Sequence, residues 1–170
     1  MSIKWVRQIL LFFLLILLQV WVFDQVHLFG IATPLVYLYF ILSLPSSINR
    51  NLTVFLAFIL GLSIDAFSYT LGMHAMAATV AGFSRDFSLK LFMSRDLPNE
   101  YVPSMRLLGF LSYLKYAAPI VLLHNIVYFF VESLSLLDPV GLILRVIGSF
   151  ILTMIVIFTF EGFNFDIFKK

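Results

Sequence analysis

The chain contains 170 residues, of which 62% are hydrophobic, 17% are aromatic and only 12% are charged. Soluble globular domains carry about 25% charged residues, so this composition, with a mean hydropathy of +1.04, excludes a water-soluble domain. The formal net charge is only +2, and the absence of cysteine excludes a disulfide scaffold, a thiolate zinc site and a cysteine nucleophile. The composition predicts an all-α integral membrane protein.

Six apolar runs have the length of about 17–25 residues that a helix needs to cross the hydrocarbon core of a bilayer. Backbone groups in lipid must be hydrogen-bonded internally, and these runs do not alternate as barrel strands do, so we expect helices. The chain is predicted to form a six-transmembrane-helix bundle, a single transmembrane domain covering residues 1–170. The predicted spans are 5–23, 28–44, 52–70, 72–92, 111–131 and 139–160.

The first two spans each allow a second interpretation. Span 5–23 follows a basic start like a signal peptide, but the stretch from Gln19 to Phe23 contains no small-residue cleavage site. We therefore expect an uncleaved helix. Span 28–44 contains Thr33-Pro34, which is typical of a helix start. The second helix can therefore begin late and leave residues 28–32 as an interfacial or re-entrant piece.

The third span carries one charge, Asp65, in the part that should be embedded in the membrane. A carboxylate there costs about 2.5–3.5 kcal/mol on insertion scales, so we expect it to face protein and to have a partner. Counting about 1.5 Å per residue from the span ends places polar groups of other spans at a similar depth. We predict a buried polar layer, with Asp65 and Arg145 as an ion pair, which His74 can join. Its members are Gln19, Asp65, His124, Asn125 and Arg145.

The role of this layer stays open at the level of sequence. A structural role is favoured, because buried polar pairs fix the register of helices. A substrate or proton pathway and a docking site for a partner's helix are the alternatives.

Small residues recur at three- and four-residue spacing on the third and fourth spans. Such faces let two helices approach closely. The pattern predicts a tight hairpin that turns at Leu71-Gly72. The residues of the two faces are Ala57, Gly61, Asp65 and Ser68 on the third span, and Gly72, Ala75, Ala78 and Gly82 on the fourth.

The fourth span is strongly apolar only as far as Ser84, because Arg85, Asp86 and Lys90 occupy its latter half. The polar stretch 85–106 mixes charged with apolar side chains. It is expected to extend the fourth helix or to lie along the interface as a basic amphipathic segment in contact with membrane lipids.

The charges are distributed unequally between the two predicted sides. An even number of spans places both termini on one side, whereas the opposite loops contain Asp24, Glu132 and Asp138 but no Lys or Arg. By the positive-inside rule, both termini and the 85–106 loop are expected to be cytoplasmic. The basic residues on that side, or at span ends facing it, are Lys4, Arg7, Arg50, Arg85, Lys90, Arg95, Arg106, Lys115, Lys169 and Lys170, and only Arg145 of the eleven is left over.

Catalytic patterns are missing from the sequence. No intramembrane serine motif, second central aspartate or phosphate-binding loop is present, and the histidines His27, His74 and His124 lie far apart. We therefore predict that the chain is not an enzyme and carries no metal or cofactor, and nothing indicates nucleic acid as a partner.

The segment around Asp65 resembles a known signature. Gly61-Leu62-Ser63-Ile64-Asp65, followed by Leu71-Gly72-Met73-His74-Ala75, is similar to the pattern G-L-x-x-D-x5-L-G-x-H-A of the MreD family, bacterial rod shape-determining membrane proteins. The similarity covers about fifteen residues, and the length of the chain also fits. The residues that match the family signature are Gly61, Asp65, Leu71, Gly72, His74 and Ala75.

The resemblance implies a non-enzymatic scaffold of the cell-elongation machinery in the bacterial cytoplasmic (inner) membrane, with a role in peptidoglycan synthesis and cell shape. It implies an MreC-like partner and links to MreB, RodA and a class B penicillin-binding protein. The family is also similar in shape to the substrate-binding S components of energy-coupling-factor transporters. The alternative function is therefore an S-component-like subunit of a small-molecule (vitamin) transporter.

Overall fold

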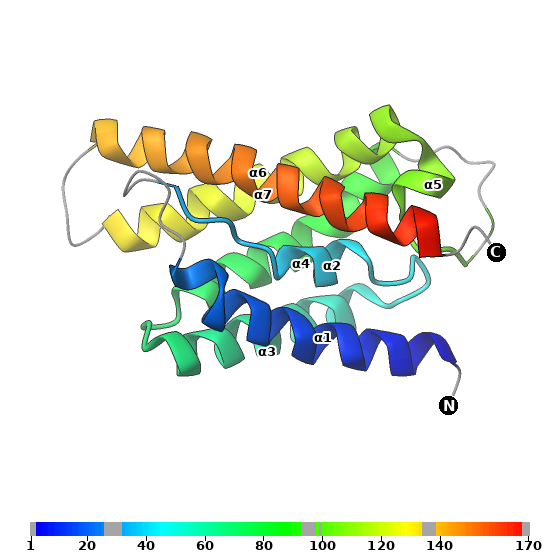
Figure 1. Cartoon of the computed structure of the whole chain (residues 1–170), viewed down its shortest axis with the longest axis horizontal. Coiled ribbons are helices and arrows are strands. Elements are labelled where there is room, and N and C mark those ends of the chain that lie inside the picture. Colours follow the sequence, from blue (N-terminus) through cyan, green and yellow to red (C-terminus); the bar gives the residue numbers. More distant parts are fainter. Residues whose placement is uncertain (1–2, 26–31, 93–97, 99, 134–138, 168–170) are drawn as a thin grey trace.

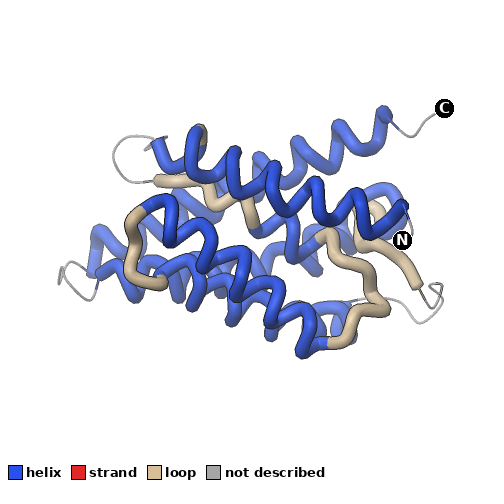
Figure 2. The backbone as a smooth tube through the Cα atoms, turned by 90° about the horizontal axis from the view of Figure 1, so that it is seen from below, coloured by secondary structure: helices blue, strands red, loops and turns tan. Residues whose placement is uncertain are grey.

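The computed structural model describes residues 3–25, 32–92, 98, 100–133 and 139–167, and all regular elements among them are helices. The long helices run along the long axis of the molecule (Figures 1 and 2). The elements are α1 (Ile3–Trp21), the 3-10 turn η1 (Phe23–Gln25), α2 (Leu38–Leu42), α3 (Arg50–Ser68), α4 (Met73–Phe92), α5 (Met105–Leu108), α6 (Phe110–Ser133) and α7 (Pro139–Ile167).

Four helical segments are long and apolar enough to cross a membrane: Trp5–Gln25, Arg50–Ser68, Phe110–Ser133 and Pro139–Phe163. Their outward faces carry large apolar side chains, among them Phe13, Trp21, Phe55 and Ile151. A soluble monomer rarely exposes so much contiguous apolar surface. These helices identify an integral membrane protein. Helix α4 is as long as α3 but carries Arg85, Asp86 and Lys90 in its last two turns.

The predicted second span, 28–44, is not a continuous helix. Residues 26–31 lie outside the described residues, 32–37 have no regular structure, and α2 is only five residues long. Pro34 contributes to this because it lacks an N–H and disfavours a helical conformation at Thr33. The segment lies between the layer that contains α6 and α7 and the layer that contains α1 and α3 (Figure 1).

Protein surrounds residues 32–45, named the enclosed segment below, and every side chain from Pro34 to Pro45 is buried. Non-helical backbone at membrane depth is tolerated only where its polar groups are satisfied. Three side chains satisfy them here. The N–H groups of Thr33 and Leu35 donate to the hydroxyls of Ser149 and Thr153, both at 2.9 Å, and Val36 N–H donates to Gln19 Oε1 at 2.8 Å.

The hairpin predicted for the third and fourth spans is confirmed, since α3 and α4 form the most extensive helix–helix contact. A Cβ at Gly61 would lie 2.5 Å from the carbonyl oxygen of His74 and 2.6 Å from the Cα of Ala75. A Cβ at Gly82 would lie 2.9 Å from the Cβ of Ala57. At position 61 only glycine lets α3 and α4 lie this close together, because any larger residue would displace the backbone of α4.

The molecule has two distinct ends (Figure 1). At the "hairpin end", residues 69–72 connect α3 to α4, and α6 ends and α7 begins. At the "terminal end", α1 begins, α7 ends and α5 lies. Both described termini of the chain are therefore at the same end of the bundle.

Candidate functional site

Asp65 binds the first turn of α4. Its Oδ1 accepts hydrogen bonds from the His74 N–H at 3.1 Å and from the Thr70 hydroxyl, and its Oδ2 accepts one from the Ala75 N–H at 2.8 Å. The first N–H groups of a helix have no partner within the helix, and the helix dipole favours a negative charge there. The buried charge is thus compensated by the neighbouring helix of the same hairpin.

The ion pair predicted between Asp65 and Arg145 is not formed. The Arg145 Nη1 lies 3.3 Å from Glu132 Oε2, and these side chains are 36% and 34% exposed. The physical reason is that donors from the hairpin occupy both oxygens of Asp65. Arg145 instead lies at the rim of the hairpin end, where the guanidinium keeps part of its hydration.

The residues that match the signature lie in the second half of α3, in the turn that follows it and at the start of α4. Gly72 has φ +78°, a left-handed conformation in which glycine carries no penalty. Leu71, in contrast, is 98% exposed and makes no contribution to the core. Gly61 sits under the start of α4, and the Asp65 contact fixes that start.

A tyrosine connects two buried histidines, one on α4 and one on α6. The Tyr37 hydroxyl lies 2.6 Å from His124 Nε2 and 3.1 Å from His74 Nδ1. The ring of Tyr128 lies 4.7 Å from that of His74 and is parallel to that of His124. His124 Nδ1 has no hydrogen-bond partner among the described residues. The cluster connects α4 and α6 to the enclosed segment.

The other predicted members of the polar layer make separate contacts. Gln19 is buried and donates to Asp24 Oδ1 at 2.8 Å and to the carbonyl of Pro34 at 3.2 Å. Asn125 is buried and donates to the carbonyl of Val121 in its own helix at 2.8 Å. The structure therefore brings Asp65, His74 and His124 together through Tyr37 and the α4 backbone, whereas Asn125 and Arg145 lie outside this group.

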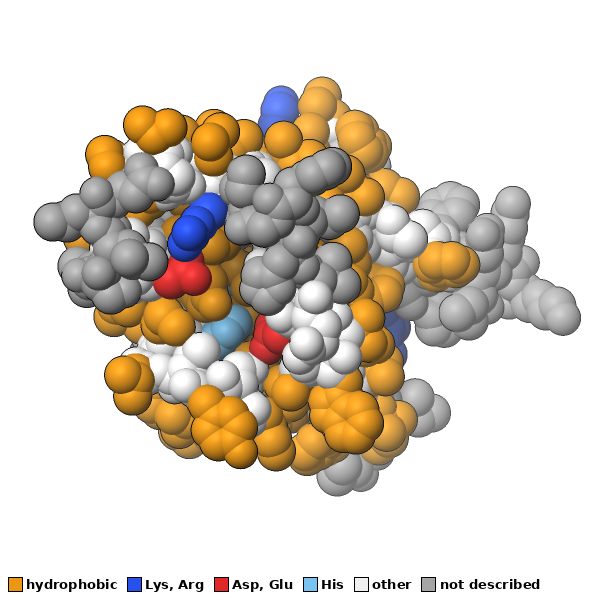
Figure 3. All heavy atoms as spheres, turned by 60° about the vertical axis from the view of Figure 1, so that its left-hand side comes forward, with side chains coloured by type: hydrophobic (Ala, Val, Ile, Leu, Met, Phe, Trp, Pro, Cys, Tyr) orange, Lys and Arg blue, Asp and Glu red, His pale blue; other side chains and the backbone are white. Residues whose placement is uncertain are grey.

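A cavity of about 580 Å³ lies at the hairpin end. Figure 3 shows it as a hollow with a histidine at its bottom, acidic groups on two sides and a basic group beside one of them. It is bordered by α1, η1, α4, α6, α7 and the end of α3. The lining residues are Val20, Asp24, Gln25, Thr33, Phe67, Ser68, Tyr69, Thr70, His74, Tyr128, Phe129, Glu132 and Arg145.

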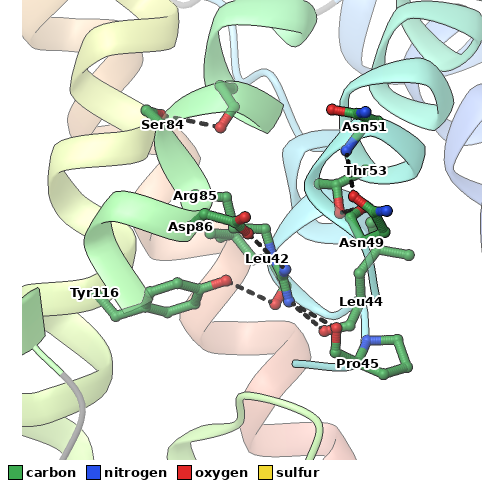
Figure 4. A network of polar contacts seen from close by, with 11 residues as sticks. Leu42, Leu44, Pro45, Asn49, Asn51, Thr53, Ser84, Arg85, Asp86 and Tyr116 are labelled. Carbon is green, nitrogen blue, oxygen red and sulfur yellow. Dashed lines mark hydrogen bonds and ion pairs between the residues drawn. The ribbon is translucent and has the colours of Figure 1, made fainter. Parts of the chain in front are cut away.

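Arg85 does not lie where the sequence predicts. It begins the polar stretch 85–106 that is expected to extend the fourth helix or to lie along the membrane interface, but its side chain is 0% exposed. Its Nη2 donates to the carbonyls of Leu44 at 2.5 Å and Pro45 at 3.3 Å, just beyond the end of α2 (Figure 4). Tyr116 donates to the carbonyl of Leu42 at 3.1 Å in the same place.

A sequence signal for this position existed. Ala78, Gly82, Arg85 and Leu89 follow one another at intervals of four, three and four residues, which places Arg85 on the small-residue face of α4. That face packs inward. The nearby charges Asp86 and Lys90, in contrast, are typical of a surface segment.

Glu161 was also missed, because it lies near the end of the last span. Its carboxylate is buried and accepts hydrogen bonds from the Tyr39 hydroxyl and the Met105 N–H, both at 2.8 Å. It thereby connects α7 to the enclosed segment and to the first turn of α5.

Comparison with known protein families, curated proteins and solved structures gives no match for this chain. Within the described part of the chain, no three His, Asp or Glu side chains are placed to hold a metal ion. The polar groups described above chiefly connect helices to one another and to the enclosed segment. The cavity at the hairpin end leaves room for a further molecule.

Proposed function

We propose that the chain is a non-enzymatic membrane scaffold of the bacterial cell-elongation machinery, similar to MreD, and that it acts in the cytoplasmic membrane. The observation that carries this proposal is the role of the signature residues. Gly61, Asp65, Gly72 and Ala75 all serve the close contact of α3 with α4, as expected of a motif that preserves a shape.

The proposal includes a topology. The enclosed segment and the five long helices would give six crossings, with both termini and the terminal end in the cytoplasm. The distribution of charge supports this orientation, because Arg7, Arg50 and Arg106 belong to the terminal end, and Asp24 and Glu132 to the hairpin end, where Arg145 is the one described basic residue. Such an arrangement would be similar in shape to an energy-coupling-factor S component.

The proposed partner is an MreC-like protein, whose transmembrane helix would contact one of the apolar outer faces. MreB, RodA and a class B penicillin-binding protein would belong to the same assembly. The basic residues of the 85–106 stretch that remain at the surface, such as Lys90 and Arg106, would contact anionic headgroups. Arg85 does not belong to that surface, because it is buried.

A complementation experiment tests the scaffold. Rod-shaped cells depleted of the native protein should become round, and the wild-type gene should restore the rod. A Gly61→Val variant should fail, because its side chain would collide with the α4 backbone. Gly162→Ala is the matched control, since nothing lies within 4 Å of the added carbon.

Copurification in mild detergent provides the second measurement. An MreC-like protein should be recovered with the wild-type chain and with Gly162→Ala. Rods that persist after depletion, together with an eluate free of any cell-elongation protein, would refute the scaffold.

One observation favours the alternative function, a substrate-binding subunit of a vitamin transporter. The cavity of about 580 Å³ at the hairpin end is lined by polar and aromatic side chains and lies within the range of about 300–1,000 Å³ typical of small-molecule sites. Recovery of ATPase subunits and of a tightly bound vitamin with the purified chain would support this function.

A further inference from the structure

The cavity at the hairpin end has a defined charge balance. Two carboxylates, Asp24 and Glu132, and one guanidinium, Arg145, line it, which gives a formal net charge of −1. Arg145 is only 3.3 Å from Glu132, so this pair is close to neutral. The excess negative charge therefore belongs to Asp24.

Asp24 lacks a cationic partner within the described residues. Its Oδ1 accepts from the Gln19 amide at 2.8 Å, and its Oδ2 accepts from the Ser68 hydroxyl at 2.5 Å. Both donors are neutral, so they orient the carboxylate without cancelling its charge. A cleft with low-dielectric walls and a single excess sign concentrates ions of the opposite sign.

The walls of the cavity are suited to an organic ion more than to a bare metal ion. Four of the lining residues are aromatic: Phe67, Tyr69, Tyr128 and Phe129. Aromatic faces attract cations electrostatically, an effect of about 0.5–2 kcal/mol depending on desolvation. Both oxygens of Asp24 already accept hydrogen bonds, and the described part of the chain offers no set of ligands for a metal.

We infer that the cavity at the hairpin end binds a small organic cation. Asp24 is the counter-ion of this cation, and the aromatic residues of the lining form part of the cavity wall. This inference goes beyond the scaffold role, and the binding of a cation depends only on the cavity. The statement that such a cation is the transported substrate rests on the second proposed function.

The absence of cysteine makes a direct test possible, because a single introduced thiol is the only one in the protein. Thr33→Cys places a thiol in the cavity lining, and Leu71→Cys places one at the fully exposed turn of the same end. Gln25→Cys, at an exposed lining position, replaces the first variant where it fails to fold. Purified protein in detergent is then treated with a cationic trimethylammonioethyl or an anionic sulfonatoethyl methanethiosulfonate.

The ratio of the cationic to the anionic reaction rate should be about tenfold higher at Thr33→Cys than at Leu71→Cys, because the local potential concentrates the cation. Adding Asp24→Asn should bring the two ratios together. Glu100→Gln, which removes a negative charge from an exposed site outside the cavity, should leave the ratio unchanged.

Competition identifies the class of ligand. Choline should slow the modification of Thr33→Cys, whereas its neutral isostere 3,3-dimethylbutan-1-ol should not. Equal rate ratios at the two thiols, faster reaction of the anionic reagent, no reaction at the cavity thiol, or equal protection by the alcohol would each overturn the inference.

These measurements are independent of cell shape and of copurified subunits. If the cavity thiol prefers the cationic reagent but no ATPase subunit copurifies with the chain, the cation site is supported and the transporter function is refuted. If an ATPase subunit copurifies but the cavity thiol shows no preference for the cationic reagent, the transporter function is supported and the cation site is refuted.

Discussion

At each end of the bundle a buried charged side chain forms hydrogen bonds with backbone groups, and the two charges have opposite signs. At the hairpin end, the carboxylate of Asp65 accepts the N–H groups that begin α4. At the terminal end, the guanidinium of Arg85, about three turns further along α4, donates to the carbonyls of Leu44 and Pro45, which follow α2. Each buried charge is therefore hydrogen-bonded to backbone groups of opposite polarity: Asp65 to the first N–H groups of α4, and Arg85 to loop carbonyls beyond α2.

The two ends differ in what remains after these contacts. The hydrogen bonds of Arg85 hold the end of the enclosed segment against α4 (Figure 4). Those of Glu161 hold this segment and α5 against α7. At the hairpin end, the polar side chains line a cavity instead. A buried charge is therefore not by itself a sign of a binding site. The free volume at the hairpin end distinguishes it from the terminal end.

The largest expected effect concerns the close contact that builds the hairpin end. Gly61→Ala should destabilise the protein by about 3 kcal/mol or more, because the added carbon meets the backbone of α4 and not a flexible side chain. Thermal unfolding in detergent, followed by circular dichroism, measures this. Gly162→Ala should unfold at or slightly above the wild-type temperature, and equal losses in both variants would contradict the interpretation.

The next effect tests the terminal end. Arg85→Met keeps an unbranched side chain but leaves the carbonyls of Leu44 and Pro45 without their donor, which should cost about 3 kcal/mol. Lys90→Met, on the exposed side of the same helix, is the control and should change stability little. Unchanged stability of Arg85→Met would show that the carbonyls find other donors.

Asp65→Asn tests the contact at the start of α4. The amide retains one acceptor but loses the charge, so we expect a loss of about 2 kcal/mol. A double-mutant cycle with Arg145→Gln should show coupling below about 0.5 kcal/mol, as for sites that share no contact. A strong coupling energy would contradict the structure and indicate the ion pair between Asp65 and Arg145 that the sequence predicted.

The smallest expected effect concerns the rim of the cavity. Glu132→Gln should cost less than about 1 kcal/mol, because its pair with Arg145 is about one-third exposed and screened by solvent. The same change at the buried carboxylate, Glu161→Gln, should cost more, since it weakens hydrogen bonds to Tyr39 and Met105. Equal effects at the two sites would remove the distinction between a rim pair and a buried connection.

The hairpin was predictable because its signal is local. Small residues at Gly61, Gly82 and their neighbours recur at helical spacing, and the turn at Gly72 follows in the same stretch of chain. The burial of Asp65 was equally predictable, since an isolated carboxylate within an apolar run must face protein. Its partner was not, because depth along a helix says nothing about the direction in which a side chain points.

The second predicted span shows the limit most clearly. Hydropathy between residues 28 and 44 is the same whether the side chains face lipid or the inside of a bundle. The structure encloses the described part, residues 32–44, and supplies its backbone with hydrogen-bond partners. Gln19 lies 17 residues from the N–H that it accepts, whereas Ser149 and Thr153 lie more than a hundred residues from theirs.

The sequence by itself determined the solvent of this protein, the places of its long helices and the face on which α3 meets α4. These properties depend on composition and on the period of a single helix. Only the tertiary structure decided that Arg85 points inward, that Arg145 pairs with Glu132 and that a cavity opens beside Asp24. Those outcomes depend on which helix ends and backbone groups meet in space, and such meetings bring together residues far apart in the chain.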